Sequence, residues 1–149
     1  MNEDQKNTLK KVLTGVTFCS LSTCSEGDPH TTMVQPSVTS ELSVIILAKK
    51  TRKKIANIQQ NSRVWLTFDA TGLFKIPKVV YMKGKAKLEP LTQDSFDDFL
   101  SYHGWITKKI LKKLTSEGLD KSTRIIVKPE KIITNGIFGK LDDTISFIL

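Results

Sequence analysis

A continuous apolar stretch followed by a short helical pattern is the strongest feature of the hydrophobic profile. Residues 44–48 are all apolar and rich in β-branched side chains, which predicts a buried strand too short to cross a membrane. Thr51 then predicts a helix N-cap, and the helical pattern continues to Gln60 with Ile55 and Ile58 on one face. We therefore expect a strand, a tight turn and a helix in this part of the chain.

Two strand-like segments precede this unit. Residues 16–23 and residues 30–39 are rich in β-branched and aromatic side chains, and the turn at 25–29 contains Gly and Pro, so the pair predicts a hairpin. Pro36 is expected to mark a bulge or the end of regular pairing. With the strand that begins near Leu42, these segments predict an antiparallel meander.

Two further strands are expected after the helix. Residues 63–69 alternate between apolar and polar positions, and residues 78–88 form a long strand pattern. Gly84 within the second pattern either lets another backbone or a ligand come close or marks a bulge. Two helices are then predicted, one after the N-cap Thr92 and one over residues 105–114.

The last part of the chain returns to strand patterns. Residues 124–128 and 131–135 are strand-like, with Pro129 expected to turn the chain between them, and the apolar tail 145–149 is expected to pack on its own domain or on a partner subunit. About six mostly antiparallel strands, with helices after the third and fifth, predict a mainly β fold with peripheral helices, a closed or split β-barrel. We expect a single domain over residues 1–149.

Composition and charge narrow the class of protein. The 39% hydrophobic content is ordinary for a globular domain, and no segment approaches the roughly 20 apolar residues of a membrane span. The polar, acid-containing N-terminus is unlike a signal peptide. A formal net charge of +8 favours anionic partners such as phosphates, nucleic acid or acidic metabolites. Cys19 and Cys24 form no disulfide framework and match no zinc spacing, so we expect a cytoplasmic protein with reduced thiols and no metal site.

Three cations at the start of the predicted 52–60 helix are the main chemical signal. Arg52, Lys53 and Lys54 fill its first turn, where the helix already carries a partial positive charge and free backbone N–H groups. An anion among them removes the conflict, and a phosphate suits the Arg fork, the Lys point charge and the Thr51 hydroxyl. The sequence thus predicts a site for the phosphate of a small cofactor, with solvated side chains as the alternative.

Three motifs in order along the chain resemble a known family. They are GDPHTTMV at 27–34, TRKKIANIQQNSRVWLTF at 51–68 and VYMKGKAKL at 80–88. Together they are similar to the pyridoxamine 5'-phosphate oxidase-like family, over roughly residues 8–135, and the chain looks like one of its short, miscellaneous members. The resemblance implies the FMN-binding split-barrel fold and a homodimer with FMN at the subunit interface.

The same resemblance implies particular cofactor-binding residues. Arg52 and Lys53 fall where the family's Arg-Lys pair holds the FMN phosphate, and Thr51 falls at the adjacent Ser or Thr. Further implied positions lie on the strand along the isoalloxazine ring and on the strand before the phosphate corner: Thr32, Met33, Val34, Gln35, Ile46 and Leu47.

Departures from the family pattern concern the substrate. Thr32 replaces an Arg common in the true pyridoxamine phosphate oxidases, and Val79 stands where those enzymes carry a flavin-contacting Gln. Their C-terminal Arg-x-His motif is not found before Leu149. We therefore expect a substrate other than pyridoxine or pyridoxamine phosphate.

Two functions follow from the resemblance, and a third from charge. The first is an FMN-dependent oxidoreductase acting on a small molecule, since flavin supplies hydride or electron chemistry. The alternative is a carrier of flavin, deazaflavin or haem without turnover. The lysines of residues 78–88 suggest a third function, a barrel that binds nucleic acid. Only one aromatic residue, Tyr81, is interleaved with these lysines, so this function ranks well below the other two.

No catalytic residue is assigned. His30, on a strand beside the implied ring position, is a candidate acid or base, with an ordinary surface or capping residue as its alternative. His103 is expected at a helix end, where a histidine is favourable electrostatically. Backbone N–H groups of residues 32–35, or the side chain of Gln35, are candidate donors to a flavin.

Overall fold

The computed structural model describes residues 1–72, 77–139 and 144–149. The helices are α1 (Glu3–Thr14), α2 (Lys53–Gln60), α3 (Gln93–Ser101) and α4 (Trp105–Leu114), and a short 3₁₀ helix, η1 (Leu119–Lys121), follows α4. The strands are β1 (Cys19–Ser25), β2 (Asp28–Val34), β3 (Pro36–Val38), β4 (Val44–Lys49), β5 (Arg63–Asp69), β6 (Val79–Pro90), β7 (Ser122–Asn135) and β8 (Thr144–Ile148).

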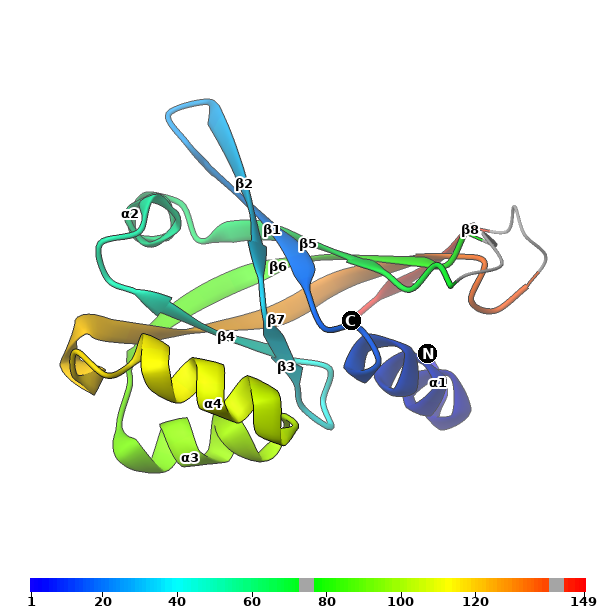
Figure 1. Cartoon of the computed structure of the whole chain (residues 1–149). Helices are drawn as coiled ribbons and strands as arrows, with labels where there is room; N and C mark the ends of the chain where they lie inside the picture. The colour runs from blue at the N-terminus through cyan, green and yellow to red at the C-terminus, as the bar shows by residue number, and fades with distance from the viewer. Residues whose placement is uncertain (73–76, 140–143) are drawn as a thin grey trace.

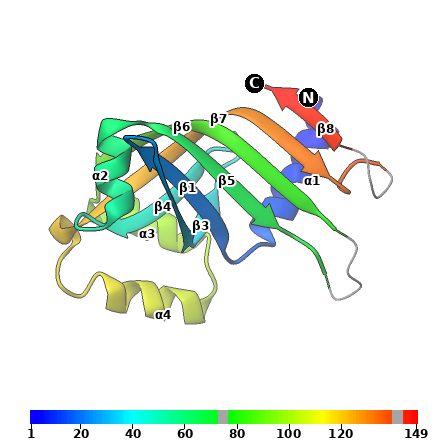
Figure 2. The same ribbon diagram turned by 90° about the horizontal axis from the view of Figure 1, so that it is seen from above.

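One antiparallel sheet organises the described residues, and it curls into a half-barrel with helices at its periphery (Figures 1 and 2). The strand order is β2-β1-β5-β6-β7-β4-β3, and β8 pairs with β7 outside this path. The predicted fold class, a mainly β split barrel with peripheral helices, is confirmed. The prediction of about six strands is too low, because the described sheet has eight.

Part of this undercount lies in the segment predicted as one strand over residues 30–39. The chain leaves regular pairing at Gln35, so β2 pairs with β1 and β3 pairs with β4. These two short strands are consecutive in sequence but lie at opposite ends of the strand order. The crossing at Gln35 therefore joins the two ends of the curled sheet. The prediction that Pro36 ends regular pairing is confirmed.

The pairing of β6 with β7 corrects a second prediction. Pro129 does not turn the chain; it lies within β7, a continuous strand of 14 residues. The register shifts between Lys83 and Gly84, where Gly84 lies opposite Pro129. A Cβ on Gly84 would lie 2.2 Å from the carbonyl oxygen of Lys128, which no real side chain tolerates. Gly84 therefore serves the close backbone approach that the sequence predicted, at a β-bulge.

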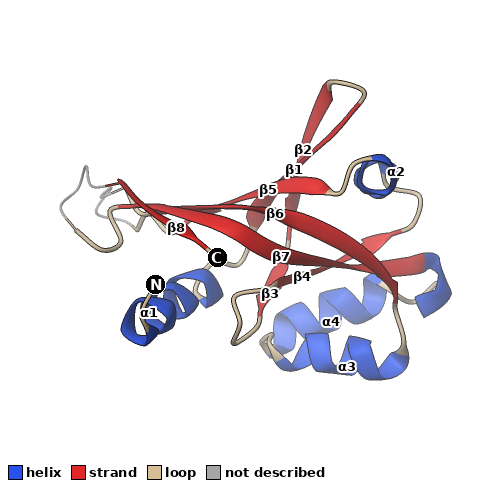
Figure 3. Cartoon of the chain, turned by 180° about the vertical axis from the view of Figure 1, so that it is seen from behind, coloured by secondary structure: helices blue, strands red, loops and turns tan. Residues whose placement is uncertain are grey.

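Strand β4 is apolar from Val44 to Ala48 because it packs against other residues on both faces. Val44, Ile46 and Ala48 belong to the main core inside the curled sheet, which α1 and α2 also join. Ile45 joins a second, smaller cluster with apolar residues of α3 and α4, and Leu47 packs against that cluster. Figure 3 shows α3 and α4 together on this outer side of the sheet.

The start of α2 differs from the prediction by one residue. Arg52, not Thr51, is the N-cap residue, and no side chain makes a capping hydrogen bond there. Thr51 is exposed in the turn before the helix. The first turn therefore begins with Lys53 and Lys54, which leaves the cations at a helix end that no side chain caps. By contrast, Thr92 caps α3 as predicted, by accepting a hydrogen bond from the Ser95 N–H.

Candidate functional site

A groove lies between the outer face of β4 and helix α4. Its larger part has a cavity volume of about 440 Å³ and is mostly apolar, with Val34, Leu47 and Leu111 among the residues that line it. Met33 and Gln35 line it from the point where the chain crosses from β2 to β3. The crossing that closes the half-barrel thus also forms one wall of the groove.

The groove continues into a smaller cavity of about 150 Å³ beside the start of α2. The two cavities share three lining residues, Leu47, Lys54 and Leu111, so they adjoin each other. Arg52 and Lys49 add two more cations at the small end. We call the combined space, with its cationic end at Arg52 and Lys54, the β4–α4 groove.

The cations at this end differ in their partners. Lys49 forms an ion pair with Glu117 at 2.8 Å, and Lys53 forms one with Asp28 at 2.8 Å, which lowers the pKa of Asp28. Within the described ranges, neither Arg52 nor Lys54 has an ion-pair partner.

Lys54 carries its charge in an unfavourable position. It is half-buried, and burial, followed by repulsion from the nearby Arg52, lowers the pKa of its ammonium group. Both causes disfavour the charged form of Lys54. An anion bound between Lys54 and Arg52 would favour the charged form of Lys54 and so offset both effects, which means that this end suits a phosphate.

Five of the nine residues implied as cofactor ligands line the groove. They come from three separate segments and are Met33, Val34, Gln35, Leu47 and Arg52. The other four lie elsewhere. Ile46 has its side chain in the main core with 1% exposure, and Thr32 lies on β2 opposite Leu21. Thr51 is exposed just before α2, and Lys53 is exposed in its first turn.

Several groove residues were not singled out from the sequence as site residues. Lys54 was noted only as part of the basic run, and its half-buried position depends on how α2 meets β4. Ile110 and Leu111 were recognised as an apolar stripe, but that pattern alone does not show which surface the helix covers. Phe18 and Thr17, just before β1, carry no local signal for a binding site.

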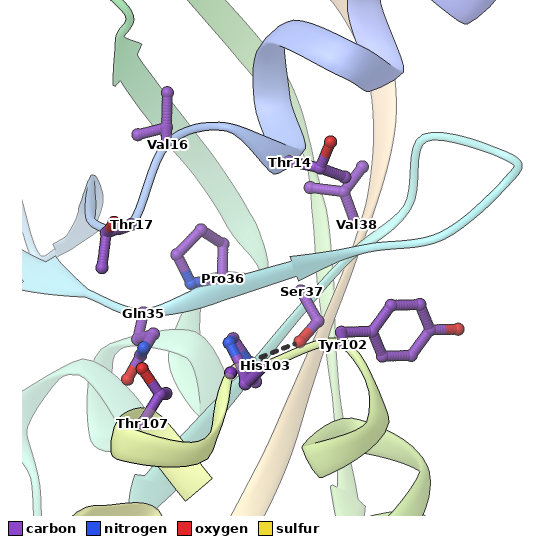
Figure 4. Close-up of a pocket in the computed structure, with 11 residues that line it drawn as sticks. Thr14, Val16, Thr17, Gln35, Pro36, Ser37, Val38, Tyr102, His103 and Thr107 are labelled. Carbon is purple, nitrogen blue, oxygen red and sulfur yellow. Dashed lines mark hydrogen bonds between the residues drawn. The ribbon is translucent and has the colours of Figure 1, made fainter.

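A third cavity, of about 210 Å³, opens beside the groove (Figure 4). It shares Thr17, Gln35 and Thr107 with the larger part of the groove. His103, in the connection between α3 and α4, lines it, and its Nε2 lies 2.9 Å from the Oγ of Ser37 on β3. Burial, followed by repulsion from Lys108, lowers the pKa of His103.

His30 has a different setting. It lies on β2 opposite Thr23 and lines none of the three cavities, and its Nδ1 is buried without a hydrogen-bond partner.

Among the described residues, no group of three or more His, Cys, Asp or Glu side chains is placed to hold a metal ion. Within the same ranges, no helix combines the length and apolar character needed to span a membrane.

Comparison with solved structures shows the same fold in other proteins. General stress protein 26 from Bacillus anthracis superposes with a TM-score of 0.73 at 18% identity, covering 97% of this chain and 98% of that one. A FAD-binding protein from Mesorhizobium loti gives a TM-score of 0.63 at 20% identity, with 83% and 87% coverage. A heme-binding protein from Mycobacterium smegmatis gives 0.74 at 13% identity, covering 99% of this chain and 59% of that one.

Sequence comparison assigns the family. No curated protein sequence matches the chain significantly. The family model described as pyridoxamine 5'-phosphate oxidase matches residues 6–136, which is most of the chain and agrees with the curled half-barrel and the groove beside β4. The chain therefore belongs to the pyridoxamine 5'-phosphate oxidase family.

Proposed function

We propose that the protein is an FMN-dependent oxidoreductase that holds FMN in the β4–α4 groove. The observation that carries this proposal is the unpaired, half-buried Lys54 beside Arg52 at one end of an otherwise mostly apolar groove. A phosphate at that end neutralises both cations, and an aromatic ring system suits the apolar remainder. The FAD-binding protein of the same fold supports a flavin as the ligand.

The residues of the groove fit this ligand in both charge and size. The guanidinium of Arg52 can bind two phosphate oxygens, and Lys54 supplies a point charge. The two parts of the groove have volumes of about 440 and 150 Å³. Taken together, they fall within the range of roughly 300–1,000 Å³ that is typical of small-molecule sites. Flavin, once bound, supplies the hydride or electron chemistry, while Gln35 and the backbone around it orient the ring and offer hydrogen bonds.

The proposal includes a homodimer that completes the groove. Three large apolar side chains that line it remain mostly exposed in the single chain: Phe18 at 55%, Met33 at 62% and Ile110 at 55%. Apolar side chains gathered around a ligand groove are typical of a surface that another molecule covers. A second subunit over this rim would exclude water from the ring, as the family resemblance implies.

A carrier without turnover is the alternative within the same groove. A heme-binding protein has the same fold, so proteins of this fold are not limited to flavin. A deazaflavin with an anionic tail would use the same cationic end of the groove. A carrier needs no space for a substrate beside its cofactor. The 210 Å³ cavity that adjoins the groove therefore favours the catalytic role.

Paired substitutions at the cationic end test the proposal. We expect Arg52→Ala combined with Lys54→Ala to weaken FMN binding at least 100-fold, because each lost charged hydrogen bond costs about 1.5–3 kcal/mol. Lys53→Ala, which removes a lysine paired with Asp28, should weaken it less than Lys54→Ala does. Lys109→Ala, at an exposed position of α4, is the matched control for loss of one positive charge. Quenching of flavin fluorescence measures each affinity.

Two results would count against the proposal. FMN affinity unchanged in the double variant, with the fold intact by circular dichroism, would show that the phosphate does not bind at this corner. A wild-type protein that binds no FMN would remove the flavin function altogether.

A further inference from the structure

The cavity beside the groove differs from the groove in one decisive respect: none of the side chains that line it carries a fixed charge. Its polar groups are hydroxyls, one amide and the imidazole of His103. These groups both donate and accept hydrogen bonds, with the hydroxyls of Ser37 and Thr107 among them. The cavity is therefore built for a polar but uncharged ligand.

His103 is the chemically versatile group of this cavity. Ser37 is 2% exposed and lies 2.9 Å from one ring nitrogen, Nε2, which holds the imidazole in a defined orientation (Figure 4). Within the described residues, no other side chain is hydrogen-bonded to the ring. Nδ1 thus keeps its capacity to donate or accept a hydrogen bond to a ligand.

Burial also affects the protonation state of His103. Its pKa is lowered by burial and then by Lys108, the charged group whose field reaches it from α4, so the ring is neutral at physiological pH. A neutral imidazole both accepts and donates, whereas an imidazolium only donates. The His103 ring also packs against the ring of Phe99 on α3, with 4.8 Å between the centroids and an interplanar angle of 47°, which further restricts its position.

The size of the cavity limits the ligand. Its volume of about 210 Å³ corresponds to about seven water molecules at their share of liquid volume. One substituted ring fills such a space. Because Thr17, Gln35 and Thr107 line both this cavity and the groove, a ligand here lies next to the mostly apolar section of the groove.

We propose that this cavity is the substrate pocket of the site, that it takes an uncharged ring compound bearing a hydroxyl or carbonyl group, and that His103, oriented by Ser37, binds that group. The inference rests on the proposed flavin function, which it sharpens by naming the class of substrate. We expect a phosphorylated substrate to bind more weakly, because no Arg or Lys of this chain lines the cavity to hold a dianion. The family's name describes a phosphate ester, so this member departs from it.

The chain contains two histidines, which makes the test direct. The protein is saturated with FMN so that the cationic end is filled, and the ring ¹⁵N and ¹H signals of both histidines are recorded by NMR. Pyridoxine and pyridoxine 5'-phosphate then serve as probes that share one ring and differ by a phosphate. We expect pyridoxine to move the His103 signals and the phosphate ester to bind at least tenfold more weakly.

Variants assign the effect to the pocket. His103→Gln removes the reporting signals and should weaken pyridoxine binding at least tenfold, measured by calorimetry. Ser37→Ala should shift the Nε2 resonance of His103, since the hydrogen bond to that nitrogen is lost, and should weaken pyridoxine binding. The matched control is His30→Gln, on β2 and outside all three cavities, which should leave pyridoxine binding unchanged.

The outcomes separate this inference from the function on which it rests. FMN binding with unmoved His103 signals overturns the pocket assignment alone. Equal or tighter binding of the phosphate ester overturns the uncharged substrate class. Failure of FMN to bind in the initial fluorescence titration overturns the proposed function instead.

Discussion

The cationic end of the groove and the cavity around His103 differ sharply in the charge of the side chains that line them. At one end, Arg52, Lys54 and Lys49 lie around a cavity of about 150 Å³. At the other, His103 and Ser37 lie in a cavity of about 210 Å³ with no fixed charge on its walls. Helix α4 lines both, with Leu111 at the cationic end and Thr107 at the uncharged end.

The difference shows how one short helix can serve two kinds of ligand group. The lysines of α4 are not among the residues that line either cavity, so the helix contributes an apolar side chain to the cationic end and a hydroxyl group to the uncharged end. The charge of the cationic end comes from the start of α2 and the end of β4. Ligand selectivity along the groove is therefore decided by the neighbours of α4.

The largest effect is expected when a cation is placed at the uncharged end, because this removes the difference in charge between the two ends. Thr17 is exposed and lines both the His103 cavity and the groove. We expect Thr17→Arg to raise the affinity of the FMN-loaded protein for pyridoxine 5'-phosphate at least tenfold, since a charged hydrogen bond contributes about 1.5–3 kcal/mol. Calorimetry measures the change. Thr8→Arg, on α1, is the control with the same charge; an equal gain there would show a nonspecific effect of net charge.

A second prediction concerns the pH dependence of stability and tests whether the charge of Lys54 is unfavourable in the folded protein. The folded-state pKa of Lys54 lies below 10.5, so between these two values the unfolded chain binds more protons. The free energy of unfolding of the FMN-free protein should therefore rise with pH through this window. Lys54→Met keeps the apolar stem and should flatten that rise relative to Lys109→Met. Urea unfolding between pH 8 and pH 10.5 gives the slopes, and identical slopes in the two variants would contradict the conflict inferred at Lys54.

The smallest effect is expected from the corresponding titration at the uncharged end. Because burial lowers the pKa of His103 below 6.5, the unfolded chain binds more protons between the folded-state pKa and 6.5. Stability should fall as the pH drops through this window, and the fall should be weaker in His103→Gln. Urea unfolding between pH 5 and pH 7.5 tests this. A wild-type slope no steeper than that of the variant would argue against a desolvated imidazole.

Local patterns identified the roles of some residues, although they placed the N-cap of α2 at Thr51 instead of Arg52. Gly84 was recognised as a point of close approach, and Thr92 as an N-cap, because both roles follow from backbone geometry. Pro129 was misread as a turn, because its position opposite a bulge in β6 depends on a strand about 45 residues away in sequence. The division of residues 30–39 at Gln35 is of the same kind, since each half pairs with a different edge of the sheet.

The candidate site shows the same limit at the level of single side chains. The basic run at residues 52–54 was visible in the sequence, but three consecutive cations at a helix start do not show which of the two lysines faces the groove. The family pattern favours Lys53, whereas in the structure Lys53 pairs with Asp28 and Lys54 lines the groove. The fluorescence titration of the single variants decides between them.

By itself the sequence determined the family, the β-rich fold class and the presence of a basic run beside the apolar strand 44–48, because these depend on composition, periodicity and motifs along the chain. Only the tertiary structure decided that His103 meets Ser37, which lies 66 positions earlier, and that α4 covers β4 to enclose a groove. The physical reason is that a cavity is made by the curling of the sheet and the packing of helices on it, and neither leaves a periodic signal in any one segment.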